Sequence, residues 1–257
     1  MTYSMPVTQK LRKLIKSLYL KQHREQNGLF IAEGEKVVAE LLKSDYDIEL
    51  GVFRESPSKS AIVLIEQIAE RGVQIFSAPK HIFDQMCDAK TPQSILAVTN
   101  IKSQSIIKGE SFIALDAVAD PGNVGTIIRT ADWFGFKQVI LNTECADKLN
   151  PKCLRSTMGS IFKIQVVQTN DMYSLIKEEF KGYSIYGADA HAEKSIKSFH
   201  PKKNFGLVFG SESHGISPAI AELVDKTFRI DGLGSAESLN VSIAAGISLY
   251  HFSNDKI

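Results

Sequence analysis

Three stretches rich in Gly, Asn, Ser and charged residues follow predicted strands in the second half of the chain. The first spans residues 116–132 and carries Asn123 and Arg129 behind a glycine-rich turn. The turn does not fit the GxGxxG pattern of dinucleotide loops, and it lacks the GK[ST] ending of a phosphate loop. On a helix that begins near Val124, Arg129 occupies the second turn, on the face near the mouth of this loop, although a solvated surface arginine is the ordinary alternative.

The second stretch spans residues 206–218, where a strand of buried character ends in a small polar turn. Gly210 and Gly215 would let the main chain approach a ligand closely. The sequence around Ser213 fails the G-x-S-x-G pattern of a nucleophile elbow, which argues against a serine hydrolase. The ordinary interpretation of Glu212 is an acidic residue near the amino end of the next helix, which needs no catalysis.

The third stretch spans residues 228–246 and contains Ser238, Leu239 and Asn240. Ser238 or Asn240 can be a plain helix N-cap, and the small residues at 244–246 can mark tight helix packing. Each of the three stretches alone supports little. Their combination and their order along the chain carry the functional inference.

The first hundred residues predict an α/β domain. After a basic helix we expect strands at 29–32, 48–53, 74–77 and 94–99, and helices at 34–43, 61–71 and 80–86. Such alternation is typical of layered α/β domains. Residues 101–110 are polar, with few side chains suited to a core, and we interpret them as a linker between domain 1–100 and domain 111–257.

The second domain, residues 111–257, predicts a parallel sheet covered by helices on both faces. We expect strands at 112–117, 138–142, 164–168, 183–188, 206–210 and 227–230, and helices at 124–134, 151–160, 172–180, 218–224 and 239–252. Pro151 and Pro218 stand at first helical positions, behind the N-cap candidates Asn150 and Ser217. Ligands of such sheets bind at the carboxyl ends of the strands, where the three stretches lie.

Composition predicts an ordinary globular protein. The chain has 257 residues, of which 44% are hydrophobic and 23% charged, and its net charge of +1 gives no global attraction to a polyanion. The apolar runs are shorter than the about 20 residues that span a bilayer. Cys87, Cys145 and Cys153 show neither disulfide nor zinc-ligand spacing, so we expect buried free thiols, no metal site and a cytoplasmic location.

Basic residues are concentrated at the amino terminus. Lys10, Arg12 and Lys13 belong to a run of six basic residues with no acid before Glu25. The run predicts a solvated helix face or an RNA-facing arm, and the sequence does not choose between them. A transit segment ranks last, because the apolar positions follow helical spacing and lead directly into a folded segment.

The ordered motifs resemble the SpoU (TrmH) family of RNA ribose methyltransferases in the SPOUT superfamily. N-x-G-x-x-x-R matches residues 123–129, G-x-E with a following glycine matches 210–215, and S-L-N-V-S matches 238–242. Residues 150–162 also look like the family's segment between the first two motifs. The resemblance implies a ribosomal-protein-like α/β substrate-binding domain, a SPOUT domain with a trefoil knot, and a homodimer with its site near the knot and the dimer interface.

The resemblance also implies the chemistry and its residues. S-adenosyl-L-methionine would be the methyl donor, held by main-chain groups at Gly210, Ile230 and Leu239, and the acceptor would be a ribose 2'-hydroxyl. The catalytic candidates are Arg129, Glu212, Asn123, Asn240 and Ser238. A guanidinium is a poor base, so we expect Arg129 to orient and stabilise the ribose oxygen while the proton leaves through water, Glu212 or a substrate phosphate.

The RNA-contact candidates are Arg155, Lys10, Arg12 and Lys13, which can pair with phosphates. Ribosomal RNA is preferred over transfer RNA as the substrate, since the amino-terminal domain resembles those of ribosomal-RNA-modifying members. The alternatives are the same chemistry on tRNA and a non-catalytic RNA-binding protein on this scaffold. A nicotinamide or nucleotide enzyme would need a phosphate loop, and a base-methylating SPOUT enzyme would carry different motifs.

The chain departs from the family pattern at two places. Asp231-Gly232 stands where many members have a Pro-Met pair, and His214 stands where members more often carry Glu or a small polar residue. The first departure bears on the geometry of the cofactor loop. Neither removes a residue that the family uses for chemistry.

Overall fold

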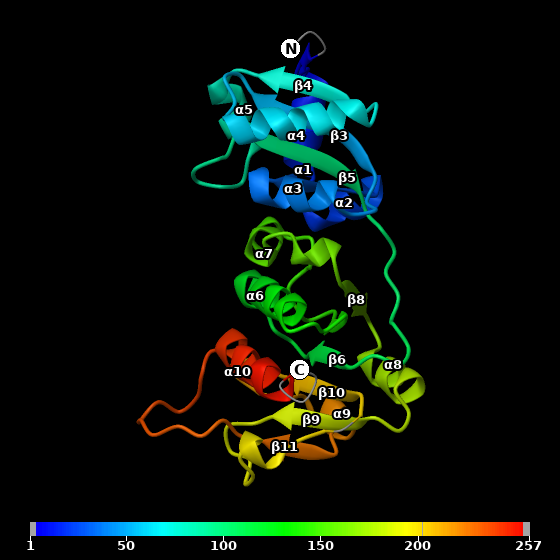
Figure 1. Ribbon diagram of the computed structural model, residues 1–257, viewed down its shortest axis with the longest axis vertical. Helices are drawn as coiled ribbons and strands as arrows, with labels where there is room; N and C mark the ends of the chain where they lie inside the picture. Colours follow the sequence, from blue (N-terminus) through cyan, green and yellow to red (C-terminus); the bar gives the residue numbers. More distant parts are fainter. Residues whose placement is uncertain (1–3, 202, 254–257) are drawn as a thin grey trace. The chain divides into compact units, whose positions relative to one another are not determined.

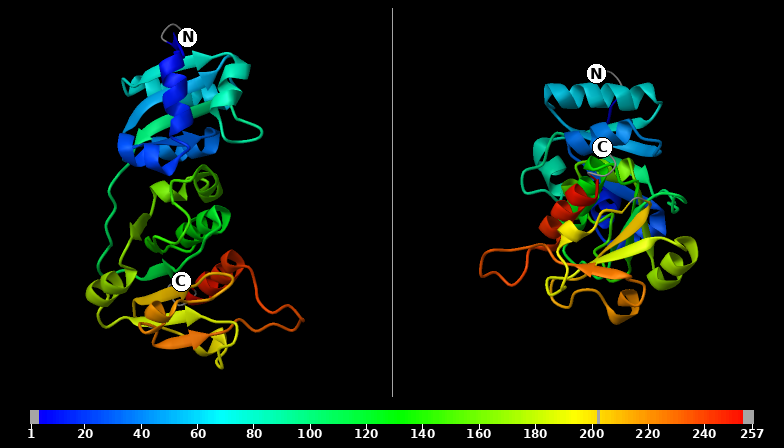
Figure 2. Two further views of the ribbon diagram at one scale, coloured as in Figure 1. Left: turned by 180° about the vertical axis from the view of Figure 1, so that it is seen from behind. Right: turned by 60° about the horizontal axis from the view of Figure 1, so that its bottom comes forward.

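The computed structural model describes residues 4–201 and 203–253, which form two compact units (Figure 1, Figure 2). The first unit contains the chain up to Ser103 together with Leu149–Phe162, and the second contains Gln104–Lys148 and the chain from Lys163 onward. The segment Leu149–Phe162, which we expected in the second domain, therefore packs with the first unit.

The first unit is built on a five-stranded mixed sheet. Its order is β1-β4-β3-β5-β2, and β5 runs antiparallel to both of its neighbours. The strands are β1 Met5–Pro6, β2 Leu29–Glu33, β3 Ile48–Arg54, β4 Gln74–Ala78 and β5 Ile95–Asn100. The helices are α1 Gln9–Ser17, α2 Lys21–Asn27, α3 Glu35–Leu42, α4 Lys59–Glu70 and α5 Lys80–Met86. The predicted α/β alternation is confirmed.

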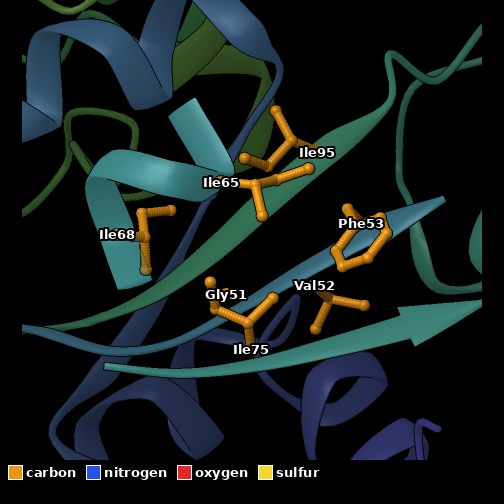
Figure 3. Close-up of a pocket in the computed structure, with 7 residues that line it drawn as sticks. All are labelled: Gly51, Val52, Phe53, Ile65, Ile68, Ile75 and Ile95. Carbon is orange, nitrogen blue, oxygen red and sulfur yellow. The ribbon is translucent and has the colours of Figure 1, made fainter. Parts of the chain in front are cut away.

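The core of the first unit has two parts, one between the sheet and helices α1 and α5, and one between the sheet and α4. Figure 3 shows residues of β3, β4, β5 and α4 around one small space in it. All of them are apolar: Gly51, Val52, Phe53, Ile65, Ile68, Ile75 and Ile95. A space without polar groups cannot orient a polar ligand, so this space belongs to the hydrophobic core and is not a binding site.

The basic amino-terminal segment forms two helices where one was expected. The side chain of Arg24 in α2 is 3% exposed, and its Nη1 donates to the carbonyls of Leu18 and Tyr19, both at 2.9 Å. These carbonyls lie just past the end of α1, where helical carbonyls lack intrahelical partners. Arg24 thus stabilises the turn between α1 and α2.

The segment after Leu149 attaches to the first unit by stacking and ion pairing. The ring of Phe162 lies 5.2 Å from that of Tyr46 and 6.4 Å from that of Phe30, centroid to centroid.

The expected helix 151–160 is divided into α7 Pro151–Thr157 and the 3-10 turn η1 Ser160–Phe162. The cause is local, because Met158 and Gly159 adopt φ values of 51° and 94°, outside the helical region.

The second unit contains a six-stranded parallel sheet in the order β11-β9-β10-β6-β7-β8, which confirms the predicted parallel architecture. The strands are β6 Phe112–Leu115, β7 Gln138–Asn142, β8 Gln165–Thr169, β9 Ser184–Ala188, β10 Phe205–Phe209 and β11 Lys226–Phe228. The helices are α6 Pro121–Trp133, α8 Met172–Glu179, α9 Pro218–Ala221, α10 Val241–Ser253 and the 3-10 turn η2 Ile196–Ser198.

The inner strands of this sheet are buried on both faces. Every residue of β6 and β10 is buried, and successive side chains of a strand point to opposite faces. Phe112 and Ala114 pack in one core cluster with residues of α8 and α9. Helices α6 and α10 contact each other (Figure 1). The trefoil knot that the resemblance implies stays a prediction.

Helix α6 begins at Pro121, three residues before the expected start at Val124. Asp120 is its N-cap, and the Asp120 carboxylate accepts from the Asn123 main-chain N–H at 3.0 Å. Pro121 fits the first helical position, because a proline there loses no intrahelical hydrogen bond. The earlier start places Asn123 inside the first turn, and it moves Arg129 from the expected second turn to the third.

Candidate functional site

The sheet order brings the first two motifs together. Strands β6 and β10 are parallel neighbours, with Leu115 opposite Phe209, so their carboxyl ends lie side by side. The first motif follows β6 and the second follows β10. Residues about ninety positions apart in sequence therefore meet at one edge of the sheet.

A chain of side-chain hydrogen bonds joins all three motifs. Asn123 Nδ2 donates to Glu212 Oε1 at 2.6 Å, and Asn240 Nδ2 donates to Asn123 Oδ1 at 3.1 Å. The amide of Asn123 thus uses its donor for the second motif and its acceptor for the third. Three of the five predicted catalytic residues are brought together by the fold.

Asn240 also caps helix α10. Its Oδ1 accepts from the Ser242 main-chain N–H at 2.9 Å and from Ser242 Oγ at 2.6 Å. The ordinary N-cap interpretation of Asn240 is therefore correct, and it coexists with the bond to Asn123. Capping fixes the amide of Asn240 so that its Nδ2 donor points toward the first motif.

The second motif forms a tight turn that leaves no room for a side chain at position 210. Ser211 and Gly215 exchange two main-chain hydrogen bonds of 3.0 Å. A Cβ built on Gly210 would lie 2.0 Å from the carbonyl carbon of Gly215, a distance that no side chain tolerates. Only glycine permits this approach at position 210, and its main-chain groups suit a ligand held through the backbone.

Arg129 stands apart from this hydrogen-bonded chain. It is exposed on α6, six residues beyond Asn123, which corresponds to a rise of about 9 Å along a helix. Within residues 4–201 and 203–253, no hydrogen bond or ion pair ties its guanidinium to another side chain. Its charge is therefore available to a ligand.

The remaining predicted residues of the third motif lie in an exposed loop. Residues 231–240, which include Ser238 and Leu239, are all exposed, while Ile230 is half-buried. Asp231, the departure from the family pattern, accepts from Ser195 Oγ at 2.6 Å and lies 3.5 Å from the side-chain nitrogens of Lys197 and Arg229. The hydrogen bond from Ser195 lowers the pKa of Asp231. Asp231 thus anchors the start of the loop.

The predicted RNA contacts of the first unit differ in availability. Lys10 and Lys13 are exposed on α1, and Arg12 donates to Gln85 Oε1 at 3.1 Å. Arg155 donates to Asp88 Oδ2 at 2.8 Å, and its Nη1 lies 4.0 Å from Glu33 Oε2. A phosphate bound at Arg155 would compete with these two carboxylates.

Two polar residues beneath the site were missed in the sequence. Asp116, at the end of β6, is 1% exposed, and Asn142 Nδ2 donates to its Oδ1 at 2.7 Å. The sequence signal that could have identified Asp116 is its position directly after four apolar strand residues. Such a carboxylate must find donors or remain unpaired at considerable cost.

The three cysteines are free and buried, as expected. Cys145 Sγ donates to the Leu115 carbonyl at 3.0 Å, and burial raises the pKa of this thiol to about 11. A thiol with a raised pKa is a poor nucleophile, which argues against a catalytic cysteine there.

In the part of the chain that the structure describes, no helix is long and apolar enough to cross a bilayer.

Comparison with known proteins identifies the family. The model of the SpoU rRNA Methylase family matches residues 110–250, and that of the MRM3-like substrate binding domain matches residues 11–97. The chain is 34% identical over 236 residues, 92% of its length and 93% of the relative's, to the 23S rRNA (guanosine(2553)-2'-O)-methyltransferase RlmP of Bacillus subtilis.

Solved structures agree over the whole length. A TrmH-family protein from Porphyromonas gingivalis is 30% identical with a TM-score of 0.82, over 96% of this chain and 98% of that one. An AdoMet-bound rRNA methyltransferase from Sinorhizobium meliloti is 27% identical with a TM-score of 0.85, over 100% and 98%. The chain belongs to the SpoU rRNA Methylase family and is an S-adenosylmethionine-dependent RNA methyltransferase.

Proposed function

We propose that this enzyme methylates a ribose 2'-hydroxyl in ribosomal RNA. The observation that carries the proposal is the hydrogen-bonded chain Glu212–Asn123–Asn240, which joins the three motifs beside the turn at Gly210. The B. subtilis relative, named for 2'-O-methylation of 23S rRNA, supports both the acceptor atom and the RNA class.

The residues would act by orientation and charge. Bound S-adenosylmethionine supplies a methyl group already activated on its sulfonium. Main-chain groups at Gly210, Ile230 and Leu239 would hold the cofactor, and Arg129 would stabilise the negative charge that develops on the ribose oxygen. Glu212, which accepts the 2.6 Å bond from Asn123, would receive the hydroxyl proton directly or through water.

The polar side chains of the third motif would position these groups. Asn240 holds Asn123, and through it the Glu212 carboxylate, at a fixed place. Ser238 would orient the hydroxyl or the guanidinium of Arg129 from the exposed loop. Fixed dipoles at a reaction centre need no reorganisation during the transfer, which lowers the barrier.

We propose a homodimer in which a second copy covers one face of α6 and α10. Ile243, Ile247 and Tyr250 repeat at helical spacing along α10 and are 54%, 39% and 59% exposed. Trp133 at the end of the contacting helix α6 is 83% exposed. An exposed apolar stripe of this kind marks an interface, and Arg129 on the same helix would lie near it.

The first unit would bind the RNA, and its match to a substrate binding domain supports this role. Lys10, Arg12, Lys13 and Arg155 are the phosphate contacts we propose, within a domain that ends near residue 100. The three buried free thiols are typical of a reducing compartment, which favours action in the cytoplasm.

The test is nucleoside mass spectrometry of ribosomal and transfer RNA from cells with and without the protein, followed by complementation with Arg129→Ala. We expect one 2'-O-methylated nucleotide of ribosomal RNA to disappear, and the variant not to restore it. Loss of the modification from transfer RNA would favour the tRNA alternative. Unchanged methylation in both pools would favour the non-catalytic RNA-binding alternative.

A further inference from the structure

Asp116 occupies the point where the first two motif turns leave the sheet. Its Oδ1 accepts from Asn142 Nδ2, and its Oδ2 accepts from the Ser217 main-chain N–H, both at 2.7 Å. Its own N–H donates to the Phe209 carbonyl at 2.9 Å. One buried residue therefore contacts the ends of β7 and β10 and the start of α9.

The partners of Asp116 belong to the turns that form the site. Ser217 ends the second-motif turn, five residues after Glu212, and it is the N-cap of α9. Asn142 extends the contact to the first motif, because its Oδ1 accepts from the Ala117 N–H at 3.0 Å. Ala117 adopts a φ of 59°, a left-handed conformation that is strained for a residue with a side chain.

The bond to Ala117 directs the chain sharply away from β6. The segment then reaches Asp120, which caps α6 and begins the helix that carries Asn123 and Arg129. A different angle at Ala117 would displace the start of α6 relative to the second-motif turn. The Asn123–Glu212 bond spans these two segments and depends on their relative placement.

A buried carboxylate at this place would be costly without a specific use. Within residues 4–201 and 203–253, no cationic side chain pairs with Asp116, and its carboxylate oxygens accept from the N–H donors of Asn142 and Ser217. An apolar side chain would fill a core position at lower desolvation cost. It could not accept from two donors on two different segments.

We propose that Asp116 is a positioning residue. It fixes the position of the first-motif turn relative to the second-motif turn and thereby shapes the cofactor pocket. It acts through Ser217 and Asn142 and does not itself touch substrate. The inference rests on one part of the proposed function, namely that the turn at Gly210 binds S-adenosylmethionine.

A reciprocal exchange of the two buried side chains tests the proposal. In Asp116→Asn, the new amide has one acceptor oxygen and cannot accept from both Asn142 and Ser217. When that oxygen accepts from Ser217, the amide NH2 groups at 116 and 142 face each other. In Asn142→Asp, two carboxylates face each other. In the double exchange, Asn at 116 donates to Asp at 142 and accepts from Ser217, while Asp at 142 still accepts from Ala117. Every hydrogen bond is restored with the two roles interchanged.

The readouts are S-adenosylmethionine affinity by calorimetry without RNA, and amide hydrogen exchange of residues 210–218 without cofactor. We expect each single variant to lose roughly tenfold in affinity, and the double exchange to return to within about threefold of the parent. Exchange in 210–218 should quicken in the single variants and slow again in the double. Asp225→Asn is the control. The Asp225 carboxylate accepts from the main-chain N–H of Ile185 near the amino end of β9, whereas the motif turns follow the carboxyl ends of their strands.

Two results would overturn the proposal. Single variants that bind S-adenosylmethionine like the parent would show that the turns do not depend on Asp116. A double exchange that binds as weakly as the single variants would assign the loss to damage of the core. A parent protein that binds the cofactor but methylates no ribosomal RNA would contradict the proposed substrate alone, because the exchange series needs no RNA.

Discussion

Asn123 and Glu212, 89 positions apart in the sequence, are joined by a 2.6 Å hydrogen bond from the amide Nδ2 to the carboxylate Oε1. Asn123→Ala removes the bond and should lower single-turnover methyl transfer roughly tenfold, as expected for one lost hydrogen bond to a charged group. Asn123→Asp should be worse at neutral pH, because two carboxylates would then face each other. Equal rates for the parent and Asn123→Asp across pH 6 to 9 would contradict this account.

Arg129→Ala should lower the rate constant of methyl transfer by about 10²–10³-fold, the usual effect of removing one group that stabilises developing charge. Affinity for S-adenosylmethionine should stay within about twofold, because the free guanidinium is assigned to the transition state and not to the cofactor pocket. Single-turnover kinetics with saturating cofactor separates the two effects. Lys181→Ala, an exposed cation of the same unit, is the control. A loss confined to cofactor binding would refute the role of Arg129.

Ile247→Glu should convert the proposed dimer into a monomer, because it places a charge on the exposed apolar stripe of α10. Sedimentation velocity gives the mass directly. Val63→Glu, at a residue of the first unit that is 52% exposed, should leave the mass unchanged. A parent protein that sediments as a monomer at micromolar concentration would contradict the dimer, whatever the variants do.

Lys148 should make the unfolding free energy depend on pH above neutrality. Its ammonium donates to Gln104 Oε1 at 2.9 Å, and burial lowers its pKa from the ordinary 10.5 to about 8. Between these values the unfolded chain binds more protons than the folded one, so stability rises with pH. The difference in unfolding free energy between the parent and Lys148→Met should therefore shift in favour of the parent from pH 8 to 10.

Urea titrations of both proteins at several pH values measure this difference. Comparison with Lys148→Met is needed because the pKa of Cys145 is raised from 9.0 to about 11, which makes stability fall with pH in a range that overlaps that of Lys148. Parallel pH dependence in the two proteins would mean that the folded protein does not depress the pKa of Lys148.

Local patterns predicted most helices and strands of both units, and the motif order predicted the family. Helix α6 begins three residues before the predicted start at Val124. Asp120 and Pro121 are strong start signals, and they outweigh the weak helix propensity of Gly122 and Asn123. The division of the basic segment into α1 and α2 depends on Arg24, whose burial against two carbonyls no periodicity encodes.

Long-range relationships could not be predicted from local patterns. The packing of residues 149–162 with the first unit depends on contacts such as Phe162 with Phe30, which are 132 positions apart. In the sequence, Asp116 was only the first residue of the first stretch and had no predicted role, because its partner Ser217 lies 101 positions away. The motifs identified the residues of the site, whereas the order of the strands in the sheet determined which of these residues contact each other.

The most direct test of the central claim is transfer of a labelled methyl group from S-adenosylmethionine to unmodified ribosomal RNA by the purified protein. After alkaline hydrolysis, which cannot cleave beside a methylated 2'-oxygen, we predict that the label remains in one alkali-resistant dinucleotide. Label released in a mononucleotide would place the methyl group on a base. That result would contradict ribose methylation even if Arg129 and Glu212 proved essential for transfer.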